Sequence, residues 1–214
     1  VTAGAAWNAA DNLVTQTQRI QGGVLDLKPM SELAPDQTLT LYQYDLTSTL
    51  LTTTVWHGQP NAAKTAVVAG TKTVTTNDLF GNLLSATTSD VASALTISAQ
   101  VVTTADSFGR PTRIDYDDGT YELRSYACCG LGSVTDRMGM TTTYSYDDLG
   151  RVFSKARAGL VTINAFDADG RILTISRKGM DDSIILQQTN TYHLAGRQTS
   201  SRDALNRTTL FSEV

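Results

Sequence analysis

Four aspartates in the sequence are each followed by a glycine three residues later and then directly by an arginine or an asparagine. The pairs are Asp78 with Gly81, Asp106 with Gly109, Asp147 with Gly150 and Asp167 with Gly170, and the arginines are Arg110, Arg151 and Arg171. A fifth copy has His193 in the aspartate position, before Gly196 and Arg197. Such a series of carboxylates could bind Ca²⁺, as aspartate repeats do in some solenoids.

The spacing of these aspartates nevertheless favours a structural role over a calcium site. Ca²⁺ takes about six to eight oxygen ligands, and one aspartate per copy supplies too few. An aspartate can instead accept hydrogen bonds from backbone N–H groups nearby, and glycine adopts positive φ at little steric cost. We therefore predict β-turns, with no metal ion and no cofactor.

The arginines form a second candidate site. A ladder of guanidinium groups could bind acidic sugars or phosphate. The formal net charge of the chain is −4, however, and many carboxylates lie close to these arginines. Pairing within the protein is therefore favoured, and nucleic acid, which requires a basic surface, is not a predicted partner.

The remaining reactive residues do not form a recognisable catalytic set. Cys128 and Cys129 are adjacent, and the sequence contains only two histidines, His57 and His193, so a metal site lacks ligands. Adjacent cysteines bridge each other only through a strained ring; pairing elsewhere in a parent protein or small apolar filling are the alternatives, the second being favoured. No Gly-x-Ser-x-Gly elbow is present. We predict no enzyme activity.

Two tryptophans, Trp7 and Trp56, could stack on a sugar ring. No other aromatic residues group with them in the sequence, so packing within a strand or core is the favoured interpretation.

The best copy of the aspartate turn occupies residues 144–151. Tyr144 and Tyr146 alternate across Ser145, which places both rings on one face of a strand. Asp147 starts the turn, and Gly150 can close a type I turn with a bulge. Arg151 then begins the returning strand, so this stretch predicts a β-hairpin with positive φ at Gly150.

Apolar and polar residues alternate with a period of two from Leu39 onward, which is typical of strands. The strands we expect are 39–44, 50–56, 71–76, 83–87 and 97–104, with the second of them closed by His57 and Gly58. Weaker turns are predicted at 117–120, 136–141 and 203–208. The gap between Gly109 and Gly150 is about twice that between Gly150 and Gly170, and a degenerate copy fits there, with Cys129 in the aspartate position and Gly132 as its turn glycine.

The first 38 residues are an irregular or degenerate lead-in, and residues 39–214 are the repeat region, truncated at both ends. Residues 5–13 are either a short helix or a degenerate hairpin, and residues 24–27 are a short strand ended by Pro29. The chain begins at Val1 without a signal peptide and ends in an alternating segment, so we expect a fragment of a longer polypeptide.

Composition predicts a folded domain rather than a disordered tail. Of the 214 residues, 41% are hydrophobic and 18% are charged. No apolar run reaches the ~18 residues that a membrane span needs. With the repeats, this predicts an all-β fold of tandem antiparallel hairpins in a continuous curved sheet.

These motifs resemble the YD repeats of RHS-repeat proteins. The family signature, Tyr-x-Tyr-Asp-x-x-Gly-Arg, matches residues 144–151, and two further copies lie at 166–172 and 191–197. The intervening Asp-x-x-Gly-x-Thr-Thr at 136–142 also matches. The resemblance covers residues 70–214 well and is weaker over 39–69. No segment matches the self-cleaving aspartyl site of toxin members, so no catalytic residue is carried over.

The resemblance implies a function as well as a fold. RHS-repeat proteins are large bacterial secreted or surface proteins whose sheet winds into a shell, and in polymorphic toxins the shell encloses a C-terminal toxin domain. The expected function is therefore a structural segment of such a shell, whose partners are the rest of the parent protein and an enclosed toxin or effector. The alternative is an adhesion module on the cell surface that binds carbohydrate or protein.

Overall fold

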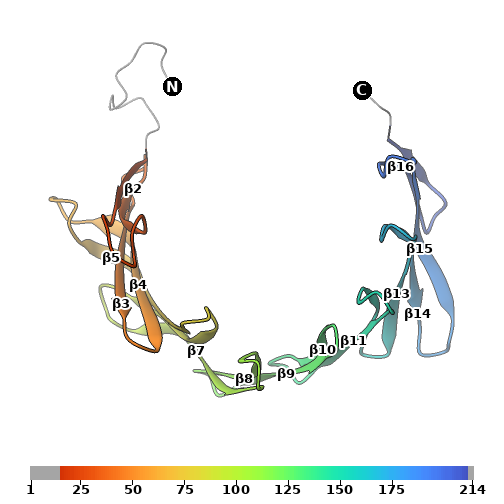
Figure 1. Cartoon of the computed structure of the whole chain (residues 1–214), viewed down its shortest axis with the longest axis horizontal. Coiled ribbons are helices and arrows are strands. Elements are labelled where there is room, and N and C mark those ends of the chain that lie inside the picture. The colour runs from red at the N-terminus through yellow and green to blue at the C-terminus, as the bar shows by residue number, and fades with distance from the viewer. Residues whose placement is uncertain (1–14, 212–214) are drawn as a thin grey trace, which may run out of the picture. The chain divides into compact units, whose positions relative to one another are not determined.

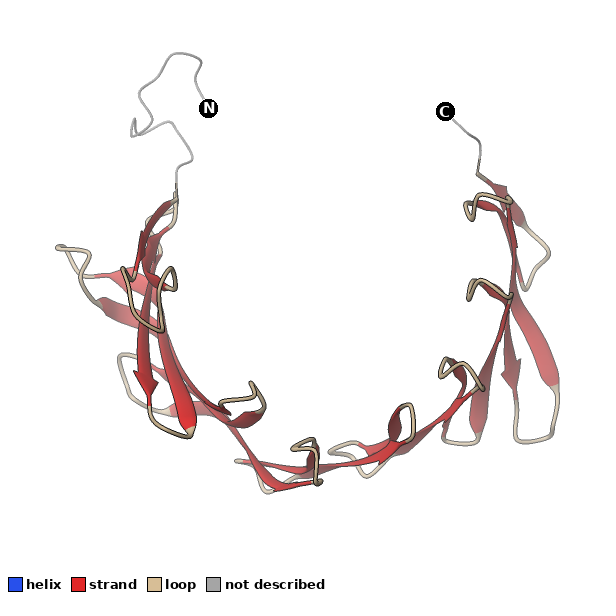
Figure 2. Cartoon of the chain, viewed as in Figure 1, coloured by secondary structure: helices blue, strands red, loops and turns tan. Residues whose placement is uncertain are grey.

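Residues 15–211 are described by a computed structural model, and within this range the chain consists of strands joined by turns (Figure 2). No helix occurs among these residues, so none is long and apolar enough to cross a membrane. Abundant threonine suits this architecture, since its branched Cβ favours extended backbone. The chain divides into two compact units, one ending at Gly119 and the other beginning at Thr120.

Eight strands form the first unit, and each pairs antiparallel with the next strand in the sequence. They are β1 (Gln16–Arg19), β2 (Pro29–Leu33), β3 (Leu39–Leu46), β4 (Leu50–Pro60), β5 (Val67–Asp78), β6 (Leu83–Asp90), β7 (Thr96–Ala105) and β8 (Pro111–Tyr116). The longest pairing joins β4 and β5, which run side by side over the whole length of β4 (Figure 1).

Nine shorter strands form the second unit, again with antiparallel pairing between sequence neighbours. They are β9 (Tyr121–Ala127), β10 (Gly130–Thr135), β11 (Thr141–Tyr146), β12 (Val152–Arg157), β13 (Leu160–Phe166), β14 (Ile172–Lys178), β15 (Ile184–Tyr192), β16 (Gln198–Asp203) and β17 (Thr208–Leu210). The predicted all-β fold of tandem antiparallel hairpins is confirmed, with a continuous curved sheet in each unit (Figure 2).

A bulge recurs at the same place in the five hairpins whose turns contain Asp78, Asp106, Asp147, Asp167 or His193. In each, the returning strand carries one extra residue at the second position after the turn. These extra residues are Leu84, Thr112, Phe153, Leu173 and Thr199. Because a bulge bends a strand and increases its twist, its repetition at one position contributes to the curvature of each sheet.

Each unit is a single layer of sheet with very little buried interior. Among the described residues, the buried hydrophobic side chains are Leu39, Val67 and Ile114. Hydroxyl pairs between neighbouring strands supply part of the cohesion, as with Thr73 and Thr88, whose oxygens lie 3.1 Å apart. Stability in such a layer comes mainly from pairing between adjacent strands and their side chains.

Three local predictions are wrong, and two of them concern the first unit. Residues 24–27 form a turn rather than a strand, with Leu27 at φ 64°, and β2 begins at Pro29. The strand from Leu50 continues through His57 and Gly58 to Pro60, because β5 pairs with it throughout. The expected helix or hairpin at 5–13, with Trp7, lies outside the described residues.

The third correction concerns the degenerate copy at 126–132. Gly132 lies within β10, not in the turn, since Ala127 pairs directly with Gly130 and leaves only Cys128 and Cys129 as the connection. A two-residue connection is a common length for a hairpin, and it replaces the longer aspartate turn found elsewhere.

Gly70 allows a close backbone approach between β4 and β5. Its φ is 139°, and a methyl group on its Cα would lie 2.1 Å from the carbonyl oxygen of His57. Gly58 faces it with the same restriction, at 2.1 Å from the carbonyl oxygen of Ala69. The glycine pair thus lets the two paired backbones approach each other more closely than residues with a Cβ atom would permit.

We expect Gly70→Ala to lower the free energy of unfolding by about 1–3 kcal/mol, the usual cost of overpacking a close contact. Urea denaturation followed by circular dichroism measures this change. Gly81→Ala is the control, because a methyl group there meets nothing within 4 Å and only the positive φ opposes it. Equal losses in the two variants would contradict the steric explanation.

Candidate functional site

The turn at Asp147 shows how one aspartate organises a hairpin end. Its backbone N–H donates to the carbonyl of Arg151 at 2.9 Å, and the N–H of Gly150 donates to the Asp147 carbonyl at 2.9 Å. The carboxylate Oδ1 accepts from the N–H groups of Leu149 and Arg151, at 3.0 and 2.9 Å. Gly150 has φ 75°, which an L side chain rarely adopts.

The arginine that follows completes the turn. Arg151 Nε donates to the second carboxylate oxygen of Asp147 at 2.6 Å. Both carboxylate oxygens are therefore occupied from within the turn, one by backbone and the other by guanidinium. We call this arrangement the aspartate turn.

The same contacts recur along the chain. Aspartates that accept two backbone N–H groups on one oxygen, from the second and fourth residues that follow, are Asp78, Asp106, Asp136, Asp147, Asp167 and Asp203. An arginine from the same turn reaches the other oxygen at Asp106, Asp147, Asp167 and Asp203. Asn82 takes this part at Asp78, at 2.8 Å.

Two of these complete turns were predicted only as weak ones. Asp203 has Asn206 in the glycine position, with φ 64°, and Arg207 as its guanidinium. Asn is the residue that most often replaces glycine at positive φ, so the sequence did hold a signal there. At Asp136 the guanidinium comes from Arg157, which no local motif indicates.

Strand alternation brings four turns of the second unit to one end of its strands. They are residues 128–129, 147–151, 167–171 and 193–197, and we call them the turn row. The residues predicted for the strong turns of this unit lie here: Asp147, Gly150, Arg151, Asp167, Gly170, Arg171, Gly196 and Arg197. Tyr144 and Tyr146 lie in β11, directly before it.

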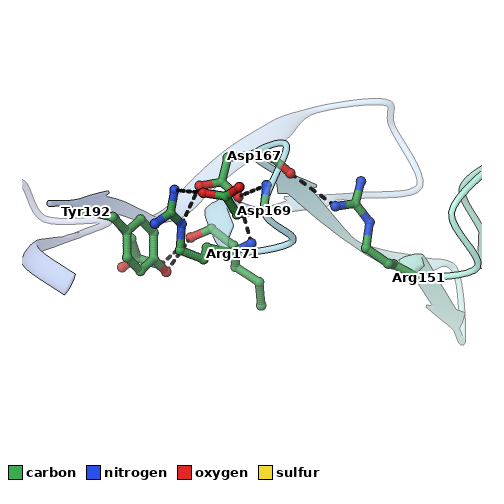
Figure 3. A network of polar contacts seen from close by, with 7 residues as sticks. Arg151, Asp167, Asp169, Arg171 and Tyr192 are labelled. Carbon is green, nitrogen blue, oxygen red and sulfur yellow. Dashed lines mark hydrogen bonds and ion pairs between the residues drawn. The ribbon is translucent and has the colours of Figure 1, made fainter. Parts of the chain in front are cut away.

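Arginines connect neighbouring turns of the row. Arg171 donates to Asp167 and Asp169, both at 2.6 Å, and its guanidinium lies 5.3 Å from the ring centre of Tyr192, which directly precedes the next turn (Figure 3). Arg151 repeats this, with an N–H that donates to the Asp167 carbonyl at 3.1 Å and a guanidinium 4.6 Å from the Phe166 ring. Each arginine thus joins its own carboxylate to the aromatic residue that precedes the next turn.

Tyrosine hydroxyls link the row in the opposite direction. The Tyr192 hydroxyl donates to the carbonyl of Ile172 at 2.9 Å, and the Tyr146 hydroxyl donates to the carbonyl of Leu131 at 3.0 Å. These acceptors lie in the hairpin before each tyrosine. Each tyrosine hydroxyl therefore satisfies a backbone carbonyl of the preceding hairpin.

His193 performs part of the aspartate's role in the last turn of the row. The ring Nδ1 accepts from the N–H of Ala195 at 3.1 Å, and the backbone pairs with Arg197 as in the other turns. Replacing aspartate by histidine keeps the turn, because the hydrogen bonds between backbone groups of His193, Gly196 and Arg197 do not depend on the side chain.

In the first unit, Asp78, Gly81, Asp106, Gly109 and Arg110 lie in the corresponding turns after β5 and β7. A methyl group on Gly109 would lie 2.9 Å from the Asn82 side-chain nitrogen, so the side chain after one turn again reaches the next. The Arg110 guanidinium lies 5.2 Å from the Phe108 ring of its own turn.

The turn contacts change the acidity of the aspartates. Hydrogen bonding from the Arg151 backbone is the main cause that lowers the pKa of Asp147; desolvation opposes it, and the Arg151 side chain lowers the pKa further. Desolvation acts to raise the pKa of Asp167, but hydrogen bonds from Arg171 outweigh it and the net pKa is lowered. The pKa of Asp106 is lowered chiefly by the Arg110 side chain.

These geometries support structure rather than ligand chemistry. Each turn carboxylate already accepts backbone and side-chain hydrogen bonds, so it has few free lone pairs for a cation. No group of three or more His, Cys, Asp or Glu side chains within residues 15–211 is arranged to hold a metal ion. Trp56 lies half-buried in β4, with the Lys72 ammonium 5.7 Å from its ring centre.

Comparison with known proteins gives matches of fold alone. No protein-family model and no curated protein sequence matches the chain. Among solved structures, a crystal structure of TcdB2-TccC3-TEV matches with a TM-score of 0.53 and 15% identity, over 88% of this chain and 11% of that one. The Photorhabdus luminescens Tc holotoxin pore matches with a TM-score of 0.54 and 15% identity, over 88% and 11%.

A third match extends further along this chain. TcdB2-TccC3 without its hypervariable C-terminal region has a TM-score of 0.53 and 14% identity, and covers 96% of this chain and 10% of that one. The chain therefore spans about a tenth of the length of the proteins it matches. At the level of fold, these matches confirm the resemblance to RHS-repeat proteins.

We expect Arg171→Lys to lower the thermal midpoint of unfolding more than Arg207→Lys. Arg171 contacts two carboxylates and a neighbouring ring, and 26% of its side chain is exposed, against 76% for Arg207. Lysine keeps the charge but loses the planar fork and the stacking. Circular dichroism melts measure both variants, and equal shifts would show that the contact between turns contributes nothing.

We expect acid to destabilise the fold through the aspartate turns. The pKa values of Asp147 and Asp167 are lowered from 3.8 in the folded chain. Their stabilising contribution is therefore complete above that unfolded value and is lost as the pH falls through the lower folded values. Urea denaturation across a pH series should show the free energy of unfolding falling below about pH 4.

The matched control for the acid effect is Asp147→Asn with Asp167→Asn. This double variant should be less stable at neutral pH and should show a shallower acid dependence, because two of the titrating groups are gone. An unchanged slope would assign the acid effect to other carboxylates.

Proposed function

We propose that this chain is a wall segment of a larger β-sheet shell, with a structural rather than an enzymatic role. The observation that carries this proposal is the single layer of sheet in each unit. Strands contact their sequence neighbours, apart from a small contact between β3 and β5, and no second layer packs on either unit within residues 15–211.

Exposed apolar residues on both faces support the same conclusion. Ile184, Ile185 and Leu186 are consecutive in β15 and are 64%, 59% and 50% exposed. Consecutive strand residues point to opposite faces, so both faces of the sheet present apolar surface. Surfaces of this kind usually contact other protein, which fits a wall with contents on one side and neighbouring chain on the other.

The fold matches support a segment of something much longer. This chain corresponds to about a tenth of the TcdB2-TccC3 chains, and another of the matched structures is the Photorhabdus luminescens Tc holotoxin pore. We infer that the partners are the rest of a parent polypeptide and an enclosed toxin or effector domain. We further infer that the parent protein is secreted or displayed on a bacterial surface.

The test is the structure and protease resistance of the full parent protein. Electron cryo-microscopy should show residues 15–211 in a closed wall around density for another part of the polypeptide. Deleting the β13–β14 hairpin should open the wall and expose that enclosed part to protease. Leu194→Ser is the control, because Leu194 is fully exposed at a turn tip and takes no part in strand pairing.

An open sheet in the parent protein, with no enclosed density and no change in protease resistance on deletion, would overturn the shell proposal. A glycan array on the same protein separates the adhesion alternative. Specific binding there, together with an open sheet, would favour a carbohydrate-binding module.

A further inference from the structure

Cys128 and Cys129 form the connection between β9 and β10 by themselves. Ala127 pairs with Gly130, so the two cysteines are the whole turn. Both thiols are free and exposed, and their sulfur atoms lie 2.6 Å apart. A turn tip is thus occupied by two thiols in mutual contact and open to solvent.

The neighbouring turn of the row covers one side of this pair. A methyl group on Gly150 would lie 3.7 Å from Cys129 Cβ and 3.9 Å from its sulfur. The Tyr146 hydroxyl lies close over Gly130, where a methyl group would approach it to 2.7 Å. Because Tyr146 also donates to Leu131, the β9–β10 turn is fixed against the Asp147 turn while its thiols remain accessible.

We propose that Cys128 and Cys129 are a reversible dithiol–disulfide site, which exchanges with a small-molecule disulfide such as oxidised glutathione. No group of three metal-ligating side chains lies here among the described residues, so the pair lacks the ligand set of a structural zinc site. Exposure and thiol contact instead favour exchange.

The exchange proceeds in two balanced steps. One cysteine thiolate attacks a sulfur of the external disulfide, whose S–S bond breaks and releases one thiol that takes up the proton. The other cysteine then attacks the resulting mixed disulfide, forms the Cys128–Cys129 bond and releases the second thiol. Two protein thiols are oxidised, and one external disulfide is reduced to two thiols.

Reversibility follows from the adjacency of the two residues. Consecutive Cα atoms are about 3.8 Å apart, less than the usual separation of about 4.4–6.8 Å across a disulfide. A bond between neighbours is therefore strained and is readily reduced again. The contact with Cys128, with a contribution from the charge of Asp147, raises the pKa of Cys129, so exchange should accelerate as the pH rises.

The test uses the whole 214-residue chain in glutathione redox buffers at a series of ratios. Samples are quenched by alkylation and analysed by intact mass. The expected oxidised product lacks a pair of hydrogens, carries no glutathione, and returns to the dithiol when reduced glutathione is in excess. The single variants Cys128→Ser and Cys129→Ser should instead retain a glutathione adduct, because no second thiol can resolve it.

Repeating the titration in urea tests whether the folded turn matters. We expect the folded chain to hold a several-fold larger fraction of disulfide than the denatured chain at the same glutathione ratio, because the fold keeps the thiols in contact. Circular dichroism confirms that the oxidised chain and both variants remain folded. Stable glutathione adducts or covalent dimers on the wild-type chain, or equal disulfide fractions with and without urea, would overturn the proposal.

Discussion

The carboxylate of the turn aspartate is the interaction on which the rest of this structure depends. One of its oxygens holds two backbone N–H groups at the hairpin end, and the other holds the arginine that leads into the next strand. Fixing that arginine also fixes where its guanidinium lies. At Arg151 and Arg171 it reaches the aromatic residue before the following turn. A local turn contact therefore becomes a contact between hairpins.

This coupling matters because the sheet has so little core. In a globular domain, burial of apolar side chains supplies most of the stability, but few side chains are buried in either unit. The stability of the fold instead comes from interactions between neighbouring hairpins, as in other repeat architectures. Strand pairing, threonine hydroxyl pairs and the arginine contacts each link one hairpin to the next. An isolated hairpin is marginal in water, so the neighbours are what make each repeat stable.

The aspartate turns fall into two sets, which differ in whether a bulge follows the turn. Turns at Asp78, Asp106, Asp147, Asp167 and His193 are each followed by a bulge. The strands flanking Asp136 and Asp203 pair without one next to the turn. Bulges also occur at the opposite end of the first unit, at Val68 and Ile97. Each bulge bends its strand, which is a simple means of curving a sheet. The cysteine turn lies at the same end of the second unit as the turns of Asp147, Asp167 and His193, as part of the turn row.

The sequence by itself determined the repeated β-hairpin and its positions along the chain. Alternation with a period of two, together with Asp147, Gly150 and Arg151 at fixed spacing, was sufficient to predict antiparallel hairpins, because these preferences act over a few residues. It also carried a signal for the turn at 203–208, because Asn206 can adopt positive φ in place of glycine. Two features differ from the prediction: the connection at Cys128 and Cys129 is shorter than expected, and β4 continues past Gly58. In both cases, pairing with the adjacent strand overrides the local turn preference.

Only the tertiary structure decided which residues meet across hairpins. The distance from Arg171 to Tyr192, the pairing of Arg157 with Asp136 and the cover of Cys129 by Gly150 depend on strand register and bulge position. A shift of one residue moves every side chain to the opposite face, and the sequence pattern does not show where a bulge makes that shift. The turns are therefore local in origin, whereas the contacts that unite them arise from register.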